Sequence, residues 1–514
     1  MKLYESCKTS IRIAFFGFAL IAIGFLIQNK NVNLFYTFKS SIVLFIGEFC
    51  LRLGEFVVMN LPIIFMLNGV CKKANNAAPV VTALVGYFTF VVTTMLFATQ
   101  SLESTAYSTG HGINSIFNLT TGTRLPLETG MIGSLLVAVA TRFAFILSRH
   151  RGNLSLTNIF SKDIAGIIYN VLFCFGGGIL IAYVYPLIFK FLQTGMRFIG
   201  EDLSDPFRIA LYSIADRVLS IIGLGNVIRQ PFWFESLGGS IQNVSTGQAI
   251  LGDVPIWSYV SSTVTDYLGA GRFITPYYVI NMFMIPGIYI GMILSMSDKK
   301  DRTGTVVAFS GAIVLSIVAG NPLPVELLML FTSPSLLGMY LVCVGSVSYA
   351  LVSSSAFLGF ETASTNTVVA MPGSFPDFII NARNVNLTST MWSIVIIGLI
   401  ALVTCVLMTM FYYRVMAFSF ANSQAANETV DAIIDSVGGK DNIIEAGSGL
   451  FKLNIYLNNP DFVFLDKVRK IGSRRVTENK DGISFEFGTS SYAIARMINK
   501  AVKNWQYRLS WLKI

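Results

Sequence analysis

The sequence predicts an all-α membrane domain followed by a small soluble domain built from helices and strands. Of its 514 residues, 53% are hydrophobic and only 13% are charged, whereas soluble globular chains carry about 25% charged residues. After about residue 420 the composition becomes polar, which predicts that the soluble part begins there. Runs apolar and long enough to enter or cross a bilayer recur before that point, at 13–28, 41–70, 79–98, 130–147, 164–194, 274–295, 304–319, 325–352 and 391–418.

The charge pattern predicts the orientation of the membrane domain. The formal net charge is +9, as expected when basic loops are kept on the cytoplasmic side of a membrane. Basic groups cluster at 72–73, 149–151 and 297–302. The basic N-terminus runs directly into the first apolar run without a small-residue cleavage site, so we expect an uncleaved first span that starts inside the cell. The pattern indicates membrane lipid as the surroundings and no nucleic-acid partner.

Cysteine and histidine usage indicates neither a disulfide framework nor a metal centre. The six cysteines are scattered, mostly within apolar segments, and lack metal-ligand spacing, which is typical of small buried side chains. His111 and His150 are the two histidines of the chain, which excludes a histidine-rich metal site. We expect no metal and no cofactor.

Residues 316–340 are apolar but cannot form one regular membrane-spanning helix. Pro322, Pro324 and Pro334 each lack an amide donor. Glu326 adds an ionisable group where a charge is costly unless it faces a cavity or a partner. Broken backbone at membrane depth is tolerated only inside protein or beside water, and often marks a transporter's substrate site. The alternative is a surface loop in which Glu326 is solvated.

Residues 208–235 form a second apolar but broken segment. They contain Asp216, Arg217 and Arg229 together with glycines and a proline, which favours a re-entrant hairpin whose ionisable groups face protein or water. The alternative is an amphipathic helix on the surface. If both broken segments line one small-molecule site, Arg217 should lie within about 20 Å of Glu326.

The C-terminal part has the pattern of a compact α/β domain. Residues 430–437 place apolar side chains on one helical face that ends at a glycine pair. Residues 451–457 alternate between apolar and polar side chains, as a half-buried strand does. Asp481-Gly482 indicates a hairpin turn, and 494–502 have helical apolar spacing. The polar residues 421–430 are a linker or the start of a helix.

Five stretches, in this order, resemble one family: 60–87 (NLPIIFMLNGV…), 215–235 (ADRVLSIIGLGNVIRQPFWFE), 270–287 (AGRFITPYYVINMFMIPG), the broken segment from Gly320 onward, and 437–443 (VGGKDNI). They are similar to the NLPLLFAIGVA, NRLLIPFGLHHIFNVPFWF, AGAFMTGFFPIMMFGLP and GITEPIEFSFLFVAPLLY segments, and to the start of the B domain, of the glucose, N-acetylglucosamine and maltose enzyme II permeases. These permeases belong to the bacterial phosphoenolpyruvate-dependent sugar phosphotransferase system (PTS).

The resemblance implies a domain order, a location and an assembly. It implies a membrane-embedded EIIC-like domain at 1–420 with about ten transmembrane helices plus re-entrant hairpins, a linker at 421–430, and an α+β sandwich EIIB-like domain at 431–505. It also implies a homodimer in the bacterial inner membrane, with the B domain cytoplasmic and a sugar as substrate.

The sugar site of the family is only partly matched by this sequence. The arginine of the family's NR pair is matched by Arg217, and the second glutamate of GITEPIE by Glu326. The histidines of GLHH correspond to Gly225 and Asn226, and the glutamate of GITEP corresponds to Leu323. We expect these five positions to form the substrate site, without the family's usual sugar ligands.

The B domain lacks the residue that carries phosphate in the family. The family's CITRLRV motif aligns with residues 449–455, which places Gly449 at the acceptor cysteine. Lys452 stands where a family arginine would stabilise the phosphoryl group. Ser448 lies next to the lost position, but a serine phosphate transfers poorly, so an ordinary loop serine is the expected role. No catalytic residue is therefore assigned, and whether the chain is an enzyme stays open.

Three hypotheses follow. The chain is a diverged sugar transporter that borrows a B domain from another polypeptide, a transporter-derived sensor or regulator, or a facilitator of an unphosphorylated solute. The corresponding partners are a sugar or other small solute, EIIA and EIIB proteins, and a transcription regulator.

Overall fold

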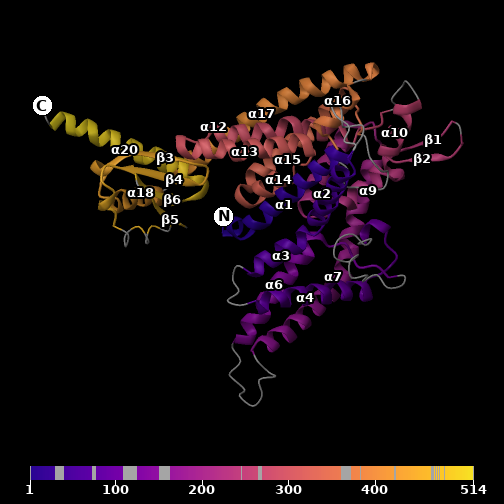
Figure 1. The fold of residues 1–514 in the computed structure, drawn as a ribbon, viewed down its shortest axis with the longest axis horizontal. Coiled ribbons are helices and arrows are strands. Elements are labelled where there is room, and N and C mark those ends of the chain that lie inside the picture. Colours follow the sequence, from indigo (N-terminus) through magenta and orange to yellow (C-terminus); the bar gives the residue numbers. More distant parts are fainter. Residues whose placement is uncertain are drawn as a thin grey trace, which may run out of the picture.

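The structure is a computed structural model with a helical body and a smaller sheet-containing unit at the C-terminal end (Figure 1). It describes residues 2–28, 40–71, 77–107, 124–149, 162–244, 246–263, 269–360, 372–382, 384–421, 424–464, 468, 471, 473, 475–479 and 481–512.

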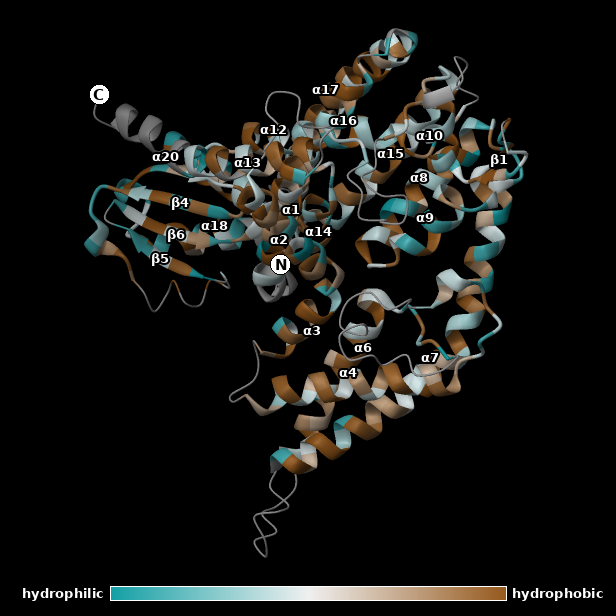
Figure 2. Ribbon diagram, turned by 45° about the vertical axis from the view of Figure 1, so that its right-hand side comes forward, coloured by the Kyte–Doolittle hydropathy of each residue, from teal (hydrophilic) through white to brown (hydrophobic). Residues whose placement is uncertain are grey.

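Eight helices among these residues are long and apolar enough to cross a membrane, which makes the protein a multi-pass membrane protein. Hydrophobic residues predominate along these helices (Figure 2), and many large apolar side chains on them are exposed, such as Phe191 at 79%. That the chain crosses the membrane about ten times stays a prediction. The eight spans lie in α1 (Lys2–Gln28), α4 (Ala78–Phe97), α6 (Gly130–Arg149), α7 (Lys162–Gly200), the stretch Thr275–Leu294, α13 (Lys299–Ala319), α15 (Pro334–Ser353) and α17 (Thr388–Ala421).

The apolar run at 41–70 is divided at Asn60 into α2 (Ser41–Met59) and α3 (Leu61–Cys71). Helix α2 packs along α1 at close range because the contact is made through glycines. A Cβ on Gly54 would lie 2.7 Å from the carbonyl oxygen of Gly17. Helix α3 has 11 residues, so it is about 16 Å long and too short to cross a bilayer.

The span Thr275–Leu294 contains a change of helix type. It consists of α11 (Thr275–Val279), a π-helical stretch (Ile280–Met284) and α12 (Ile285–Leu294). Asn281 in the π-helical stretch is buried, and its carbonyl oxygen accepts a hydrogen bond of 3.1 Å from Ser316 Oγ on α13. Local widening of this kind is frequent near functional sites.

Both broken segments are buried inside the helical body. The segment 208–235 forms α8 (Pro206–Ile221) and α9 (Gly225–Trp233), and the other segment forms α14 (Leu323–Thr332) before α15. Asp216 and Arg217 are each 2% exposed and Glu326 is 0% exposed. The surface-helix and surface-loop alternatives are therefore both wrong.

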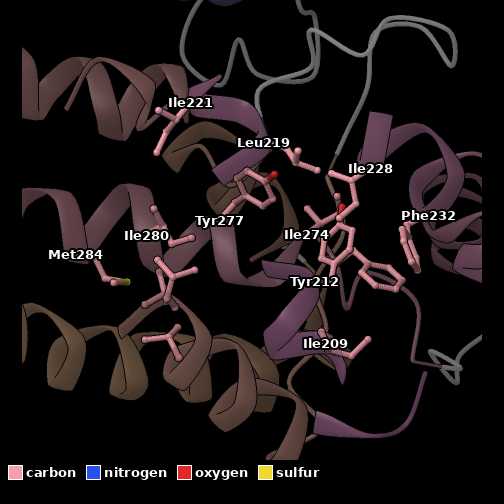
Figure 3. Packing of buried hydrophobic residues seen from close by; sticks show 14 of the residues in the cluster. Ile209, Tyr212, Leu219, Ile221, Ile228, Phe232, Ile274, Tyr277, Ile280 and Met284 are labelled. Atoms are coloured by element: carbon pink, nitrogen blue, oxygen red, sulfur yellow. The ribbon is translucent and has the colours of Figure 1, made fainter. Parts of the chain in front are cut away.

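Helix α8 is fixed by packing on α15 and by an aromatic cluster. Ser213 and Ser348 share a hydrogen bond of 2.7 Å between the two helices. The ring of Tyr212 lies 4.9 Å from that of Phe232 on α9 and 4.5 Å from that of Phe273 (centroid distances). Figure 3 shows Tyr212 and Phe232 together with Ile274 at the centre of this core. Beside it lie a hairpin, β1 (Ser240–Gln242) and β2 (Ala249–Leu251), and the helices α10 (Asp253–Thr263) and α16 (Phe375–Asn381).

The C-terminal unit has its own hydrophobic core, within 430–502. Four antiparallel strands lie in the order β3 (Ile443–Ser448), β4 (Lys452–Leu457), β6 (Gly482–Glu486) and β5 (Val476–Asn479). Helices α18 (Gln424–Ser436) and α20 (Ser491–Leu512) supply the rest of the core. The predicted helix, strand, hairpin and final helix are confirmed. Residues 424–430 belong to α18, and the domain boundaries stay a prediction.

Candidate functional site

A cavity of about 260 Å³ lies where the broken segments meet α1, α3 and α4. This volume is near the lower end of the range for small-molecule sites. Polar side chains and backbone occupy much of its wall, from segments far apart in the chain. The polar or charged residues that line it include Asn60, Glu128, Thr129, Arg217, Ser220, Asn226, Arg229, Tyr277 and Asn321.

The guanidinium of Arg217 is held in place by two carboxylates and a hydroxyl. It donates to Asp216 Oδ2 from Nη2 at 2.7 Å and from Nε at 3.0 Å. Its Nη1 lies 3.5 Å from Glu326 Oε1, and its Nη2 lies 3.0 Å from Tyr277 Oη. Tyr340 donates to the same Glu326 oxygen at 2.9 Å. Burying a charge is tolerated when it is paired and hydrogen-bonded in this way.

Arg229 is the second cation of the cavity and reaches it from α9. Its Nε donates to Asp216 Oδ1 at 2.6 Å, and its Nη2 donates to Ser220 Oγ at 2.6 Å. Asp216 therefore bridges two guanidinium groups. The side chain of Arg229 is 18% exposed, against 2% for Arg217, so Arg229 is the arginine that presents its charge to the cavity.

Backbone turns bring these side chains together. Helix α8 ends at Gly223, whose φ of +80° is accessible to glycine at no steric cost. The preceding carbonyl, that of Ile222, accepts a hydrogen bond of 2.9 Å from Met131 N at the start of α6. At the other wall, Gly320 ends α13 with φ +60°, and Asn321 Oδ1 accepts from Leu323 N at 2.9 Å.

No family model matches the chain. The chain is 23% identical over 454 residues to the protein named PTS system glucose-specific EIICBA component from Staphylococcus carnosus (strain TM300). The match covers 85% of this chain and 63% of that protein. The chain is thus similar to the glucose-specific enzyme II permeases of the PTS, as its sequence motifs predicted. It spans less than two thirds of the length of that curated relative.

Four of the five segments that resemble the PTS permeases contribute to the lining of the cavity. Four of the five predicted site residues line it: Arg217, Gly225, Asn226 and Leu323. The fifth, Glu326, lies behind Arg217 as its ion-pair partner. The expected proximity of Arg217 and Glu326 is confirmed, and their roles in substrate binding stay a prediction.

Sequence reasoning missed several residues that line the cavity or hold its arginines in place. Asp216 and Arg229 were recognisable as charges within an apolar segment but were not assigned to the site. Tyr277 gave no signal, because a tyrosine within an apolar span is ordinary. The cavity position of Asn60 follows from the turn between α2 and α3, which hydropathy alone does not locate.

Ser220 and Arg229 lie against Gly225, the position that the resemblance aligns with a family histidine. A Cβ on Gly225 would lie 2.7 Å from Ser220 Oγ and 3.4 Å from Arg229 Cζ. The family motif has asparagine where this chain has Arg229. The arginine thus occupies space that a side chain at position 225 would need.

Gly449, which the resemblance aligns with the acceptor cysteine, is buried between the C-terminal unit and the helical body. Gly449 follows β3, and a Cβ there would collide with Asp301 Oδ2 at the start of α13. Ser448 is also buried and shares a hydrogen bond of 2.9 Å with Ser297. Lys452, at the start of β4, is exposed.

The described part of the chain contains no evident metal-binding site. Within these residues, no group of three or more His, Cys, Asp or Glu side chains could hold a metal ion. His111 and His150 lie outside the described residues.

Proposed function

We propose that this protein is a diverged PTS-type sugar transporter of the bacterial inner membrane, with its B domain in the cytoplasm. In this proposal the membrane domain binds a small polyhydroxylated solute in the cavity, and the attached B domain does not phosphorylate it. The observation that carries the proposal is the cavity itself, because Arg217, Asn226 and Leu323, from two broken segments, line one cavity. Binding sites of transporters are commonly built from interrupted helices in this way.

The polar groups of the cavity suit hydroxyl-rich solutes. Asn60, Asn226 and Asn321 each offer an amide that can both donate and accept, as a sugar hydroxyl requires. The buried pair of Arg217 and Glu326 gives the wall a fixed charge distribution without a net charge.

Differences from the family point to altered selectivity. Leu323 provides no carboxylate for sugar hydroxyls, and each buried hydroxyl left unpaired would cost about 1–3 kcal/mol. Arg229 supplies donors where the family segment has a shorter side chain. We therefore propose that the solute is a small sugar or sugar-like molecule bound with a hydrogen-bond pattern of its own.

The chemistry of the acceptor position supports transport without self-phosphorylation. A phosphocysteine works as a relay because a thiolate is both a good nucleophile and a good leaving group. Gly449 has no side chain, and Ser448 is buried and hydrogen-bonded to Ser297. Any phosphoryl group must then come from the EIIB domain of another chain, or the solute enters unphosphorylated.

A second candidate function is that of a sensor or regulator. The observation that favours it is the contact of the acceptor-less B domain with the membrane domain. A domain that no longer carries phosphate could still dock an EIIA protein or a transcription regulator.

Uptake into reconstituted vesicles tests these proposals. Radiolabelled glucose, N-acetylglucosamine and maltose are offered with and without phosphoenolpyruvate, the general phosphotransfer proteins, an A domain and an intact separate B domain. If the protein is a transporter, labelled sugar should enter the vesicles, and it should be phosphorylated only when the separate B domain is added. Binding without flux favours the sensor. Sugar phosphate made without an added B domain would contradict the proposal.

A further inference from the structure

The loop that joins the span Thr275–Leu294 to α13 contacts the acceptor loop of the B domain through several specific hydrogen bonds. The amides of Ser297 and Asp298 donate to the carbonyl oxygen of Ser448, at 3.0 and 2.9 Å. In return, Ser448 N donates to Ser297 Oγ at 2.8 Å. These three hydrogen bonds join two loops that are about 150 residues apart in the chain.

Two carboxylates complete the contact. Asp298 Oδ2 accepts from Tyr456 Oη at 2.8 Å, and Asp301 Oδ2 accepts from Asn454 Nδ2 at 3.0 Å. Asp298 also caps α13 through its other oxygen, which accepts from Asp301 N at 2.9 Å. Burial and the neighbouring Asp298 keep the pKa of Tyr456 above its usual value, so this hydroxyl stays a donor at neutral pH.

Two glycines of the B domain make room for these carboxylates. A Cβ on Gly447 would lie 2.6 Å from Asp298 Oδ2, and a Cβ on Gly449 would collide with Asp301 Oδ2. Both glycines are buried. An acceptor side chain at position 449 would therefore displace the Asp301 carboxylate from its place beside Asn454.

We propose that residues 297–301 are a built-in ligand for residues 447–456 of the B domain, so that the former acceptor loop is now an intramolecular docking site. The loss of the side chain at 449 is then the change that permits docking, and Asp301 occupies the space it vacated. This inference goes beyond the proposed transport function and does not depend on which solute is carried.

Hydrogen exchange of the full-length protein in lipid nanodiscs tests the docking. The amides of 297, 298 and 448 report the contact, because their hydrogen-bond partners lie across it. The amides of β4 report the fold of the B domain itself.

The test uses three variants and a control. In Gly449→Ala, the reporter amides should exchange at least tenfold faster while β4 is unchanged. In Asp301→Ala, the increase should be smaller, since the Asn454 contact alone is lost. The double variant should exchange no faster than Asp301→Ala, because the clash is then relieved. Asp435→Ala, on the exposed face of α18, should have no effect.

Two results would overturn the proposal. One is exchange of the reporter amides at unprotected rates in the unmodified protein. The other is unchanged protection in Gly449→Ala with an intact β4. If Gly449→Ala unfolds the B domain, Asp301→Ala decides alone, because that substitution lies in the membrane domain; unchanged protection in it contradicts the docking.

Discussion

Arg217 and Glu326, 109 positions apart in the chain, form a buried ion pair with 3.5 Å between Nη1 and Oε1. The arginine is also bonded to Asp216, and the glutamate to Tyr340. The pair therefore joins α8 to α14 beside the cavity. Its contribution to stability and its contribution to binding can be separated experimentally.

Replacing one partner of this ion pair should destabilise the protein more than replacing both. Arg217→Leu leaves the Glu326 carboxylate buried without its cation, and we expect a loss of about 3–5 kcal/mol in stability. Arg217→Leu with Glu326→Leu should recover part of this loss, because no uncompensated charge remains at Glu326. Thermal unfolding in detergent measures the difference.

A surface pair provides the control for this prediction. Glu201 pairs with Arg208 at 3.1 Å and is 66% exposed, so Glu201→Ala should change stability by about 1 kcal/mol or less. A double variant less stable than Arg217→Leu would contradict the ion-pair argument.

A histidine at position 225 should be better tolerated when Arg229 is replaced as well. Gly225→His places a side chain against Ser220 and Arg229, so the single variant should unfold at a lower temperature. Adding Arg229→Asn should restore only part of the unfolding temperature, because the guanidinium leaves space for the imidazole but Asp216 loses one of its two cations. Equal stability of the single variant and the unmodified protein would mean that the wall is not closed there.

The chain should not become labelled by phosphoenolpyruvate with the two general phosphotransfer proteins and a glucose-type A domain. Gly449 offers no nucleophile, and Gly449→Cys should give at most weak label. The flanking Phe451 and Lys452 supply neither a hydroxyl nor a bidentate guanidinium. Radiolabel retained on the protein after electrophoresis measures this.

The contact of Asp301 with Gly449 suggests a matched variant for the labelling experiment. Gly449→Cys with Asp301→Ala should be labelled more than Gly449→Cys alone, because a carboxylate no longer crowds and repels the phosphoryl group. Acid-stable label on Ser448 of the unmodified chain, passed on to sugar, would show instead that the attached B domain works.

The membrane domain is expected to form a homodimer with an apolar helical interface, as the family resemblance implies. Crosslinking in native membranes should trap a dimer, and native mass spectrometry in mild detergent should find the same mass. A monodisperse monomer in both experiments would contradict this expectation.

The fold was predictable where hydropathy and periodicity act locally. All eight long apolar helices coincide with apolar runs of the sequence. In the C-terminal unit the helices, β4 and the β5–β6 hairpin follow from alternation and glycine signals, whereas β3 was not predicted. The break between α2 and α3 and the π-helical stretch at 280–284 depend on packing between helices, which a linear pattern does not contain.

The candidate site was predictable only through its charges. Arg217 and Glu326 are conspicuous because ionisable groups are costly in apolar segments. The contact of 297–301 with the B domain was not predictable. The segment SDKKDR has the composition of a basic cytoplasmic loop, and nothing in its composition indicates that Asp298 and Asp301 face a partner loop. Pairing between distant loops is decided by the tertiary arrangement.

Helix α13 begins at the docked loop and ends at Gly320 on the cavity wall. Its 21 residues form a helix about 32 Å long. Because a helix is stiff along its axis, a shift of the wall at 320–323 would move Asp298 and Asp301 with it. Solute in the cavity would then alter the contact with the C-terminal unit through this one helix, without a covalent change.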